Sequence, residues 1–477
     1  MAVELDERER LARPIAAPGP AGAVAAARPT GMSRRVLGLA WPVIAQNLLE
    51  TLVGVIDTLL VAHLGAVAIA GVGAALQVVF ILLAILSAVS IGAAILVAHA
   101  IGAGDRPGAE RLAKQTLVWG LLGALPLAAL GALTAGPLIR AFGVAPDVAA
   151  VGTSYLRITM VMLPPLLLVF AGGAVLRGAG DTRTPLFVSL LSNVLNAILA
   201  YGLIYGHLGL PALGAAGSAW AAASGRLVSA ATLVAVLVWG RGGLSLRGRR
   251  DWWPRFAAVR RVLALGVPAA LEQTLVSAAF TALTVIVAEL GTQALAAQRI
   301  AFNALSVAFL PGIGFSIAAS TLVGQSLGAG RPDEGAAAAR ASAAWAVAWM
   351  GAMGLGFFLL SGPIMDVFTD DGAVLDLGAG SLRVLALALP LWGLLFVFSG
   401  ALRGAGNTRF PLLANTAGTW LVVALGYAAV NHFGGGLVLV WGFFLPASLL
   451  NALANWWRFR RGDWRNVSLA REVPRAA

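Results

Sequence analysis

Long apolar stretches separated by short polar connections recur along the chain from about residue 36 onward. Each stretch holds the roughly 20 residues that a helix needs to cross a ~30 Å hydrocarbon core. The runs are continuous and rich in Leu and Ala, without the period-two alternation of barrel strands. The pattern therefore predicts an all-α integral membrane protein. Its twelve transmembrane helices are expected near residues 36–63, 67–99, 115–138, 153–175, 185–206, 213–239, 262–289, 294–324, 340–362, 380–401, 411–431 and 435–457.

The two halves of the chain repeat each other. The segment LRGAGDTRTPL begins at Leu176 and LRGAGNTRFPL begins at Leu402, a separation of 226 residues. Each repeat holds six predicted spans, an even number, so both repeats run in the same sense across the membrane. We expect two six-helix bundles related by a pseudo-two-fold axis, with a substrate cleft between them. The same offset relates Pro42 to Pro268, Gly65 to Gly291, Gly102 to Gly328, Gly136 to Gly362, Arg157 to Arg383 and Pro164 to Pro390.

The repeats and their polar connections set the expected domain boundaries. The lobes span residues 36–239 and 262–457, and a disordered tail over 1–35 precedes them. A basic linker over 240–261 joins the lobes, and its arginines and aromatic residues predict that it lies along the membrane surface. A second tail covers 458–477. The first tail lacks the pattern of a signal peptide.

Composition supports the membrane assignment and excludes several other classes of protein. Hydrophobic residues make up 59% of the chain and charged residues 11%, whereas soluble domains carry about 25% charged residues. The chain has no cysteine and only four histidines, which lie near span ends, are expected at the membrane interface and form no cluster. We therefore expect no metal site, no cofactor and no enzymatic activity.

The distribution of the formal net charge of +12 indicates how the chain is oriented in the membrane. If the N-terminus lies inside, 28 of the 33 Lys and Arg residues fall on the inner side, as expected for short cytoplasmic loops. The sequence thus predicts a multi-pass membrane protein with both termini in the cytoplasm and no nucleic-acid partner.

Two glycine-rich segments superficially resemble phosphate-binding loops. These are GAGDRPGAE at residues 102–110 and the repeated RGAG loops. No strand is predicted before them and no Lys-Ser/Thr follows, so neither nucleotide-binding fingerprint is met. Asp181 and Asn407 are better explained as caps of the helices that follow.

Few polar side chains lie within the predicted spans, where a charge costs about 2.5–3.5 kcal/mol. The first span contains Gln46, Asn47, Glu50 and Asp57. Glu50 and Asp57 are seven residues apart, about two helical turns, so both point along one face, which we expect to meet the cleft. Two nearby carboxylates at low dielectric favour protonation of at least one, as a proton-coupled carrier requires. The alternative is a static carboxylate that braces the bundle.

Other exceptional residues within the spans leave alternatives open. Glu272 either attracts cationic substrates or lies at the membrane interface. Pro42 and Pro268 are either hinges, because an internal proline removes a backbone hydrogen bond, or ordinary helix-start prolines. Arg226 lies deep in the sixth span and requires a partner that the sequence does not identify.

These residues resemble the multidrug and toxic compound extrusion (MATE) family, most closely its bacterial DNA-damage-inducible-protein-F-like branch. The resemblance lies in WPVIAQNLLETLVGVIDT of the first span, the paired RGAG loops, PAALEQ of the seventh span and VGQSLGAG at the end of the eighth. It covers residues 36–457 and implies a location in a bacterial inner membrane.

The resemblance implies roles for particular residues. Asp57 matches the family's coupling aspartate, and Tyr155, Asn196 and Ser218 match the polar network around it. Ala200 stands where archaeal-type members have a second aspartate. The absence of this second aspartate favours protons as the coupling ion, because sodium prefers several hard oxygen ligands. Span 10 also lacks the acid found in sodium-dependent branches. Pro42 matches the bend of the first helix, and Glu50 falls where relatives line the drug cavity.

The predicted function is a secondary antiporter that exports amphipathic, often cationic, organic compounds in exchange for protons by alternating access. The cavity is expected to include Glu50, Gln46, Asn47 and Glu272. The bilayer and small organic substrates are the expected partners of a monomer. The alternatives are sodium-coupled efflux by the same fold, or a flippase for lipid-linked precursors, which the acidic cavity disfavours.

Overall fold

The computed structural model describes residues 29–240, 243–466 and 469. Across these ranges the chain forms helices joined by turns, and no strand occurs within them. Eleven helices are long and apolar enough to cross a membrane. A bent pair, α5 (Pro146–Val161) and α6 (Leu163–Ala179), brings the number to twelve when it is counted as one span. The predicted all-α class with twelve spans is confirmed.

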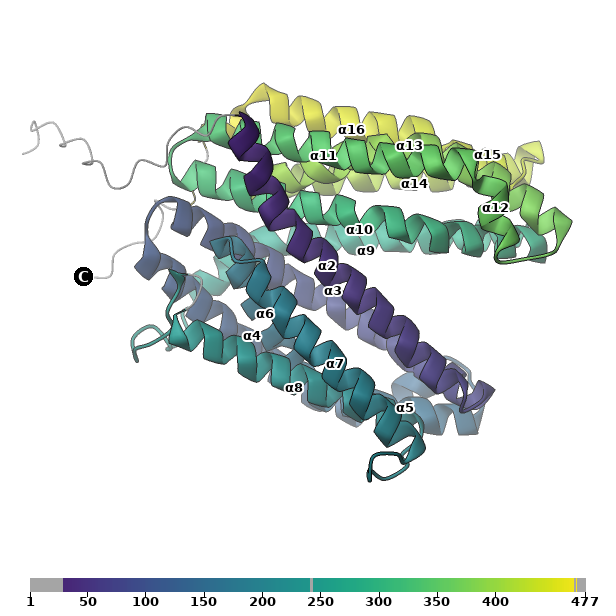
Figure 1. Ribbon diagram of the computed structural model, residues 1–477, viewed down its shortest axis with the longest axis horizontal. Helices are drawn as coiled ribbons and strands as arrows, with labels where there is room; N and C mark the ends of the chain where they lie inside the picture. Colours follow the sequence, from purple (N-terminus) through teal and green to yellow (C-terminus); the bar gives the residue numbers. More distant parts are fainter. Residues whose placement is uncertain (1–28, 241–242, 467–468, 470–477) are drawn as a thin grey trace, which may run out of the picture.

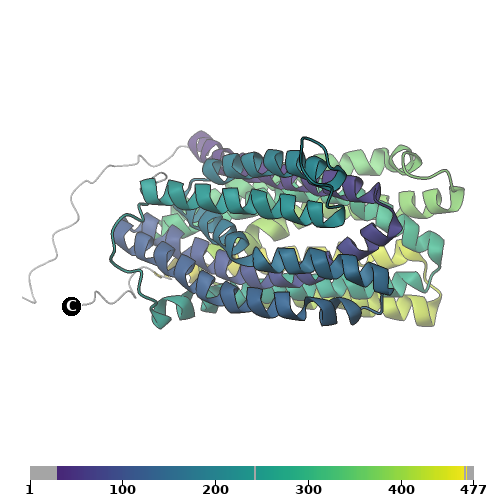
Figure 2. The ribbon, with the colours of Figure 1, turned by 90° about the horizontal axis from the view of Figure 1, so that it is seen from below.

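The helices form two lobes that meet at one end of the molecule and diverge toward the other (Figure 1). Figure 2 shows the N-terminal lobe in front, with its helices running lengthwise. This lobe comprises α5, α6, α2 (Pro29–Ala62), α3 (Ala66–Gly102), α4 (Arg106–Arg140), α7 (Arg183–Tyr205) and α8 (Ala215–Trp239). The C-terminal lobe comprises α9 (Phe256–Ala288), α10 (Thr292–Gly328), α11 (Pro332–Leu359), α12 (Ser361–Asp366), α13 (Gly372–Gly404), α14 (Arg409–Phe433), α15 (Leu437–Gly442), α16 (Phe444–Arg461) and the short 3₁₀ turn η2 (Asp463–Asn466).

Three predicted boundaries differ from those of the helices. Helix α2 begins at Pro29, so the last residues assigned to the first tail are helical, while residues 1–28 lie outside the described ranges. Helix α9 begins at Phe256, inside the predicted linker. At the other end of the chain, Trp464 is buried and stacks on Phe459, so the start of the second tail packs on its lobe.

The fourth span is broken, which the sequence analysis did not predict. Helices α5 and α6 meet at an angle of 52° around Met162. Pro164 and Pro165 follow directly, and two successive prolines remove two backbone donors from the helical ladder. The corresponding Pro390 of the second repeat stands alone, and α13 continues through it as one helix.

Helix α2 belongs to both lobes. Its first half packs on α10 and α11, where Met32, Val36 and Ala40 join a core cluster of the C-terminal lobe. Its second half packs on α7, and the Tyr205 hydroxyl donates to the Leu60 carbonyl oxygen at 2.7 Å. Pro42 lies between the two halves and well inside the helix. The alternative of a helix-start proline is therefore wrong for Pro42.

The lobes meet closely at the end of the bundle that carries the RGAG loops (residues 177–180 and 403–406), which we call the RGAG end. A methyl group on Gly266 of α9 would overlap the carbonyl oxygen of Ala88 on α3. In the equivalent crossing of α10 on α2, a methyl group on Gly314 would lie 3.2 Å from the carbonyl oxygen of Ala40 and 2.5 Å from Ile44. Small residues allow helix backbones to approach in this way.

Two repeat-related side chains connect the lobes across the RGAG end, and we call them the paired latch. The Thr321 hydroxyl of α10 also donates across this boundary, to the Arg177 carbonyl oxygen at 3.4 Å. His99 of α3 donates from Nε2 to the Gly404 carbonyl oxygen at 2.9 Å. Gln325 of α10 donates from Nε2 to the Gly178 carbonyl oxygen at 3.0 Å. Donors and acceptors are each related by the 226-residue repeat offset. The latch therefore follows the pseudo-two-fold symmetry, and the expectation that His99 is interfacial is wrong, because its exposed fraction is 1%.

Candidate functional site

Asp57 lies on the second half of α2, where this helix crosses α7. Both of its carboxylate oxygens accept hydrogen bonds from the side-chain amide of Asn196, at 3.1 and 3.0 Å. Asn196 is buried in the N-terminal lobe, whereas Asp57 is only partly buried. The carboxylate is thus fixed on its lobe by a side chain that cannot easily move.

Arg226 of α8 completes this site. It is the nearby cation that acts electrostatically on both Asp57 and Tyr155. Tyr155 of α5 and Ser218 of α8 are buried next to each other on the same side of the lobe. The structure therefore brings Asp57, Tyr155, Asn196 and Ser218 together, as the family resemblance implied, and adds Arg226 to the group.

Arg226 stands out in the sequence as an arginine within a span, but the sequence does not identify its partner. The cost of a charge inside the bilayer was the available signal. Arg226 comes near Asp57 only through the packing of α8, α5 and α2, which no local sequence pattern encodes.

Glu50 lies nearer the RGAG end of α2 and is exposed. Its carboxylate accepts from Gln46 Nε2 at 2.9 Å and from the Ser189 hydroxyl at 3.5 Å. Arg177, the arginine of the first RGAG loop, acts on Glu50 electrostatically. Asn47 is half-buried on the same helix, and its carbonyl oxygen accepts from the Thr51 hydroxyl at 2.9 Å.

Glu272 occupies a different environment, deep in the C-terminal lobe. Asn415 of α14 donates to Glu272 Oε1 at 2.6 Å, and Arg403 of the second RGAG loop lies 3.5 Å from Oε2. The network continues from Asn415 to Ser399 and Asn455. The interfacial alternative for Glu272 is therefore wrong. Its predicted place in the substrate cavity stays untested, but its carboxylate is occupied by partners of its own lobe.

The arginine of each RGAG loop thus interacts with an acid on the first helix of its own lobe. Arg177 interacts electrostatically with Glu50, and Arg403 lies 3.5 Å from Glu272. Within the same loops, the carbonyl oxygens of Gly178 and Gly404 accept the latch bonds from the opposite lobe. Each RGAG motif therefore interacts with its own lobe through its arginine and with the opposite lobe through its glycine carbonyl oxygen.

The helix caps at the RGAG end follow the sequence expectation. Asp181 Oδ1 accepts from the backbone N–H of Arg183 and Thr184, at 3.1 and 3.0 Å. Asn407 Oδ1 accepts from the backbone N–H of Phe410 at 3.3 Å. These side chains satisfy free donors at the starts of α7 and α14.

Comparisons with known proteins agree with the repeat architecture. The MatE family model matches residues 42–202 and again residues 268–428. The two matches are displaced by the same 226 residues as the sequence repeats.

Relatives resemble the chain over almost its whole length. A probable multidrug resistance protein NorM of Thermotoga maritima is 29% identical over 442 residues, which cover 92% of this chain and 95% of the relative. A probable multidrug resistance protein NorM of Burkholderia mallei is 33% identical over 463 residues, with coverage of 92% and 95%.

A solved structure described as the outward-facing conformation of a multidrug resistance MATE family transporter of the MOP superfamily has the same fold. It superposes with a TM-score of 0.84 at 22% identity, covering 91% of this chain and 97% of that one. With two matches to the family model and relatives aligned from end to end, the chain belongs to the MATE family, whose members are membrane transporters and not enzymes.

Proposed function

We propose that this protein exports amphipathic, often cationic, organic compounds in exchange for protons, with Asp57 as the proton-binding residue. The observation that supports this proposal is the group around Asp57, in which one partly buried carboxylate is held by Asn196 and lies close to Arg226. Two relatives are named as probable multidrug resistance proteins, which supports the substrate class.

The donors around Asp57 favour a proton over sodium as the coupling ion. Sodium, like other hard cations, is held by several oxygen ligands. Asp57 instead faces the amide N–H groups of Asn196 and the positive charge of Arg226, both of which repel a second cation. A proton needs only one carboxylate oxygen.

Protonation of Asp57 gives a physical route to conformational change. The neutral acid no longer balances the charge of Arg226, and an uncompensated charge in a low-dielectric lobe is unfavourable. The contacts of α2 with α7 and α8 then rearrange. Because the first half of α2 is anchored in the other lobe, a movement of its second half changes how the lobes meet.

We place the RGAG end in the cytoplasm, since the arginine-rich linker and most basic connections belong to this end. With the paired latch closed there, the described conformation is outward-facing. Glu50 then lies on the divergent side of the latch, where its exposed carboxylate favours cationic substrates. Assignment to the F-like branch, the inner membrane as location and the monomeric state remain predictions.

The coupling ion can be tested with the wild-type protein in proteoliposomes. We expect an imposed pH gradient in sodium-free buffer to drive accumulation of a cationic dye. Accumulation that requires a sodium gradient would establish the alternative coupling ion. Scrambling of a fluorescent lipid-linked precursor, without dye transport, would establish the flippase.

A further inference from the structure

A groove of about 370 Å³ opens on the side of the bundle, between the two lobes and apart from the site around Asp57. Thr116, Trp119 and Gly123 of α4 form one wall, Phe256 and Val262 of α9 form the other, and Val89 of α3 also contributes. The lining is almost entirely apolar. Since these helices span the bilayer, the natural occupant of such a groove is an acyl chain.

The linker, which borders the groove at Gln115, carries a strongly basic surface. Arg247, Arg249 and Arg250 are exposed on the linker, and Arg260 is exposed on the first turns of α9. Two acids contact this segment: Asp251 pairs with Arg255 at 3.0 Å, and Glu110 of α4 accepts from the backbone N–H of Ser245 at 2.9 Å. Basic clusters at a membrane interface attract anionic lipid headgroups.

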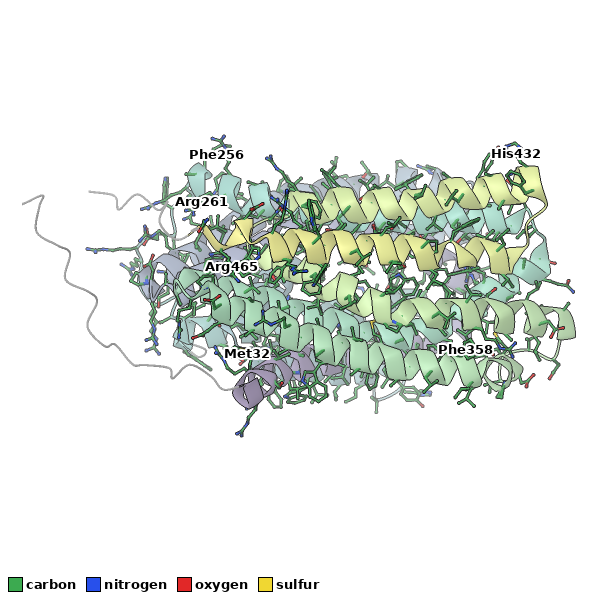
Figure 3. The ribbon with its side chains drawn as sticks, turned by 90° about the horizontal axis from the view of Figure 1, so that it is seen from above. Met32, Phe256, Arg261, Phe358, His432 and Arg465 are labelled. Atoms are coloured by element: carbon green, nitrogen blue, oxygen red, sulfur yellow. The ribbon has the colours of Figure 1, made fainter. Side chains whose placement is uncertain are left out.

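Aromatic side chains place the mouth of the groove at the interface between membrane and water. Phe256 is 72% exposed and packs edge-on against Trp119. Figure 3 shows Phe256 at the margin of the bundle, near the same end as Arg261. Exposed aromatic rings prefer the headgroup level of a bilayer, so the arginines lie where phosphates lie and the groove lies where acyl chains lie.

The two walls belong to different lobes, and the linker, which continues into α9, is hydrogen-bonded to α4 as far as Arg255. Lys114 of α4 donates to the carbonyl oxygens of Gly248 and Arg250, and Gln115 donates to those of Asp251 and Trp253. The linker therefore moves with the N-terminal lobe, whereas α9 moves with the C-terminal lobe. A lobe movement that opens the RGAG end separates the walls of the groove.

We propose that the groove binds an anionic phospholipid of the leaflet at the RGAG end, with an acyl chain between α4 and α9 and the phosphate at the linker arginines. A ligand that binds one conformation better than another shifts the population toward it. The lipid therefore stabilises the conformation in which the RGAG end is closed. The proposed orientation decides only which leaflet supplies the lipid, and the lipid site holds for either coupling ion.

The test uses a residue that can fill the groove without disturbing the helix. A side chain added at Gly123 meets no atom within 4 Å, so Gly123→Phe occupies the groove. Gly356→Phe on α11 is the matched control, because a side chain added there also meets nothing within 4 Å. Thermal unfolding is measured in nanodiscs of phosphatidylcholine alone and of equal parts phosphatidylcholine and phosphatidylglycerol.

We expect phosphatidylglycerol to raise the Tm of the wild type and of Gly356→Phe, and we expect the rise to be lost in Gly123→Phe. Combined substitution of Arg247, Arg249 and Arg250 by Gln keeps the groove but removes the headgroup site, and it too loses the rise. Inorganic phosphate and glycerol phosphate, which lack acyl chains, have no effect. A phosphatidylglycerol effect that survives in Gly123→Phe, or one matched by inorganic phosphate, overturns the proposal. Because dye transport is not the readout, failure here is distinct from failure of the proposed function.

Discussion

Asp57 and Arg226 are charged residues that stand out because they lie within apolar spans. Asp57 could be selected from its position in an apolar span, because burial of a charge is costly unless it serves a purpose. Arg226 was equally conspicuous, but its partner depends on how α8 packs against α5 and α2. The sequence therefore identifies which residues are exceptional, and the fold identifies which of them act together.

The electrostatic coupling between Asp57 and Arg226 can be measured by a double-mutant cycle. We expect Asp57→Asn and Arg226→Gln each to destabilise the protein, because each leaves a charge without its partner. The double variant should recover about 0.5–3 kcal/mol relative to the sum of the single effects. Unfolding in detergent provides the free energies, and additive effects would show that the two charges do not interact.

Glu272 is expected to act in stability, given its contacts with Asn415 and Arg403. Glu272→Gln should lower stability by about 1–3 kcal/mol, because Arg403 loses its counter-charge. The KM for a cationic dye should stay unchanged, because the carboxylate is engaged by Asn415 and Arg403 of its own lobe. Glu50→Gln is the comparison, and it should raise KM with little loss of stability. A raised KM in Glu272→Gln would instead support its predicted place in the substrate cavity.

Helix α2 is the element that joins the two lobes. Its two halves lie in different hydrophobic clusters, and Pro42 interrupts the hydrogen-bond ladder between them. The positions of the spans were predictable because they depend only on length and hydropathy. The shared role of α2 was not, because both halves look equally apolar, and the break at Met162 depends on a second proline whose effect the hydropathy pattern does not show.

Replacing Pro42 with Ala should stiffen α2. The substitution restores a backbone donor to the ladder and removes the steric conflict of the proline ring. We expect dye transport to slow severalfold while thermal stability stays the same or rises. Pro268→Ala in α9 is the repeat-related control. A Pro42→Ala variant that transports normally would show that bending at this residue is not required.

The paired latch and the close glycine contacts determine which end of the assembled transporter is closed. Each latch residue donates to an RGAG carbonyl oxygen of the opposite lobe. Gly102 and Gly328 have no room for a side chain, because a methyl group on either would overlap a backbone carbonyl oxygen across the lobe boundary. The repeated motif was visible in the sequence, but its function in closure appears only when the lobes are placed together.

Closure at the RGAG end can be followed by distance measurement. The chain has no cysteine, so spin labels at Phe142→Cys and Val367→Cys report the separation of the lobes without background. We expect combined His99→Ala and Gln325→Ala to shift the population away from the outward-facing state by roughly 5–150-fold, for a coupling of about 1–3 kcal/mol. Gly328→Ala should prevent closure more completely.

Two variants serve as controls for the latch. His99→Gln places at one latch position the residue found at the other, so it should preserve the wild-type distances. Gly73→Ala lies on α3, where an added side chain meets no atom within 4 Å, and it should leave them unchanged. Equal distances in the wild type and in the combined latch variant would contradict the assignment.

The most direct test of the coupling proposal is proton flux through the reconstituted protein when a cationic dye is added. In sodium-free proteoliposomes, we expect dye-dependent proton movement in the wild type and in Glu50→Gln at saturating dye, and none in Asp57→Asn. Dye-dependent proton movement that persists in a folded Asp57→Asn variant would contradict the proposal.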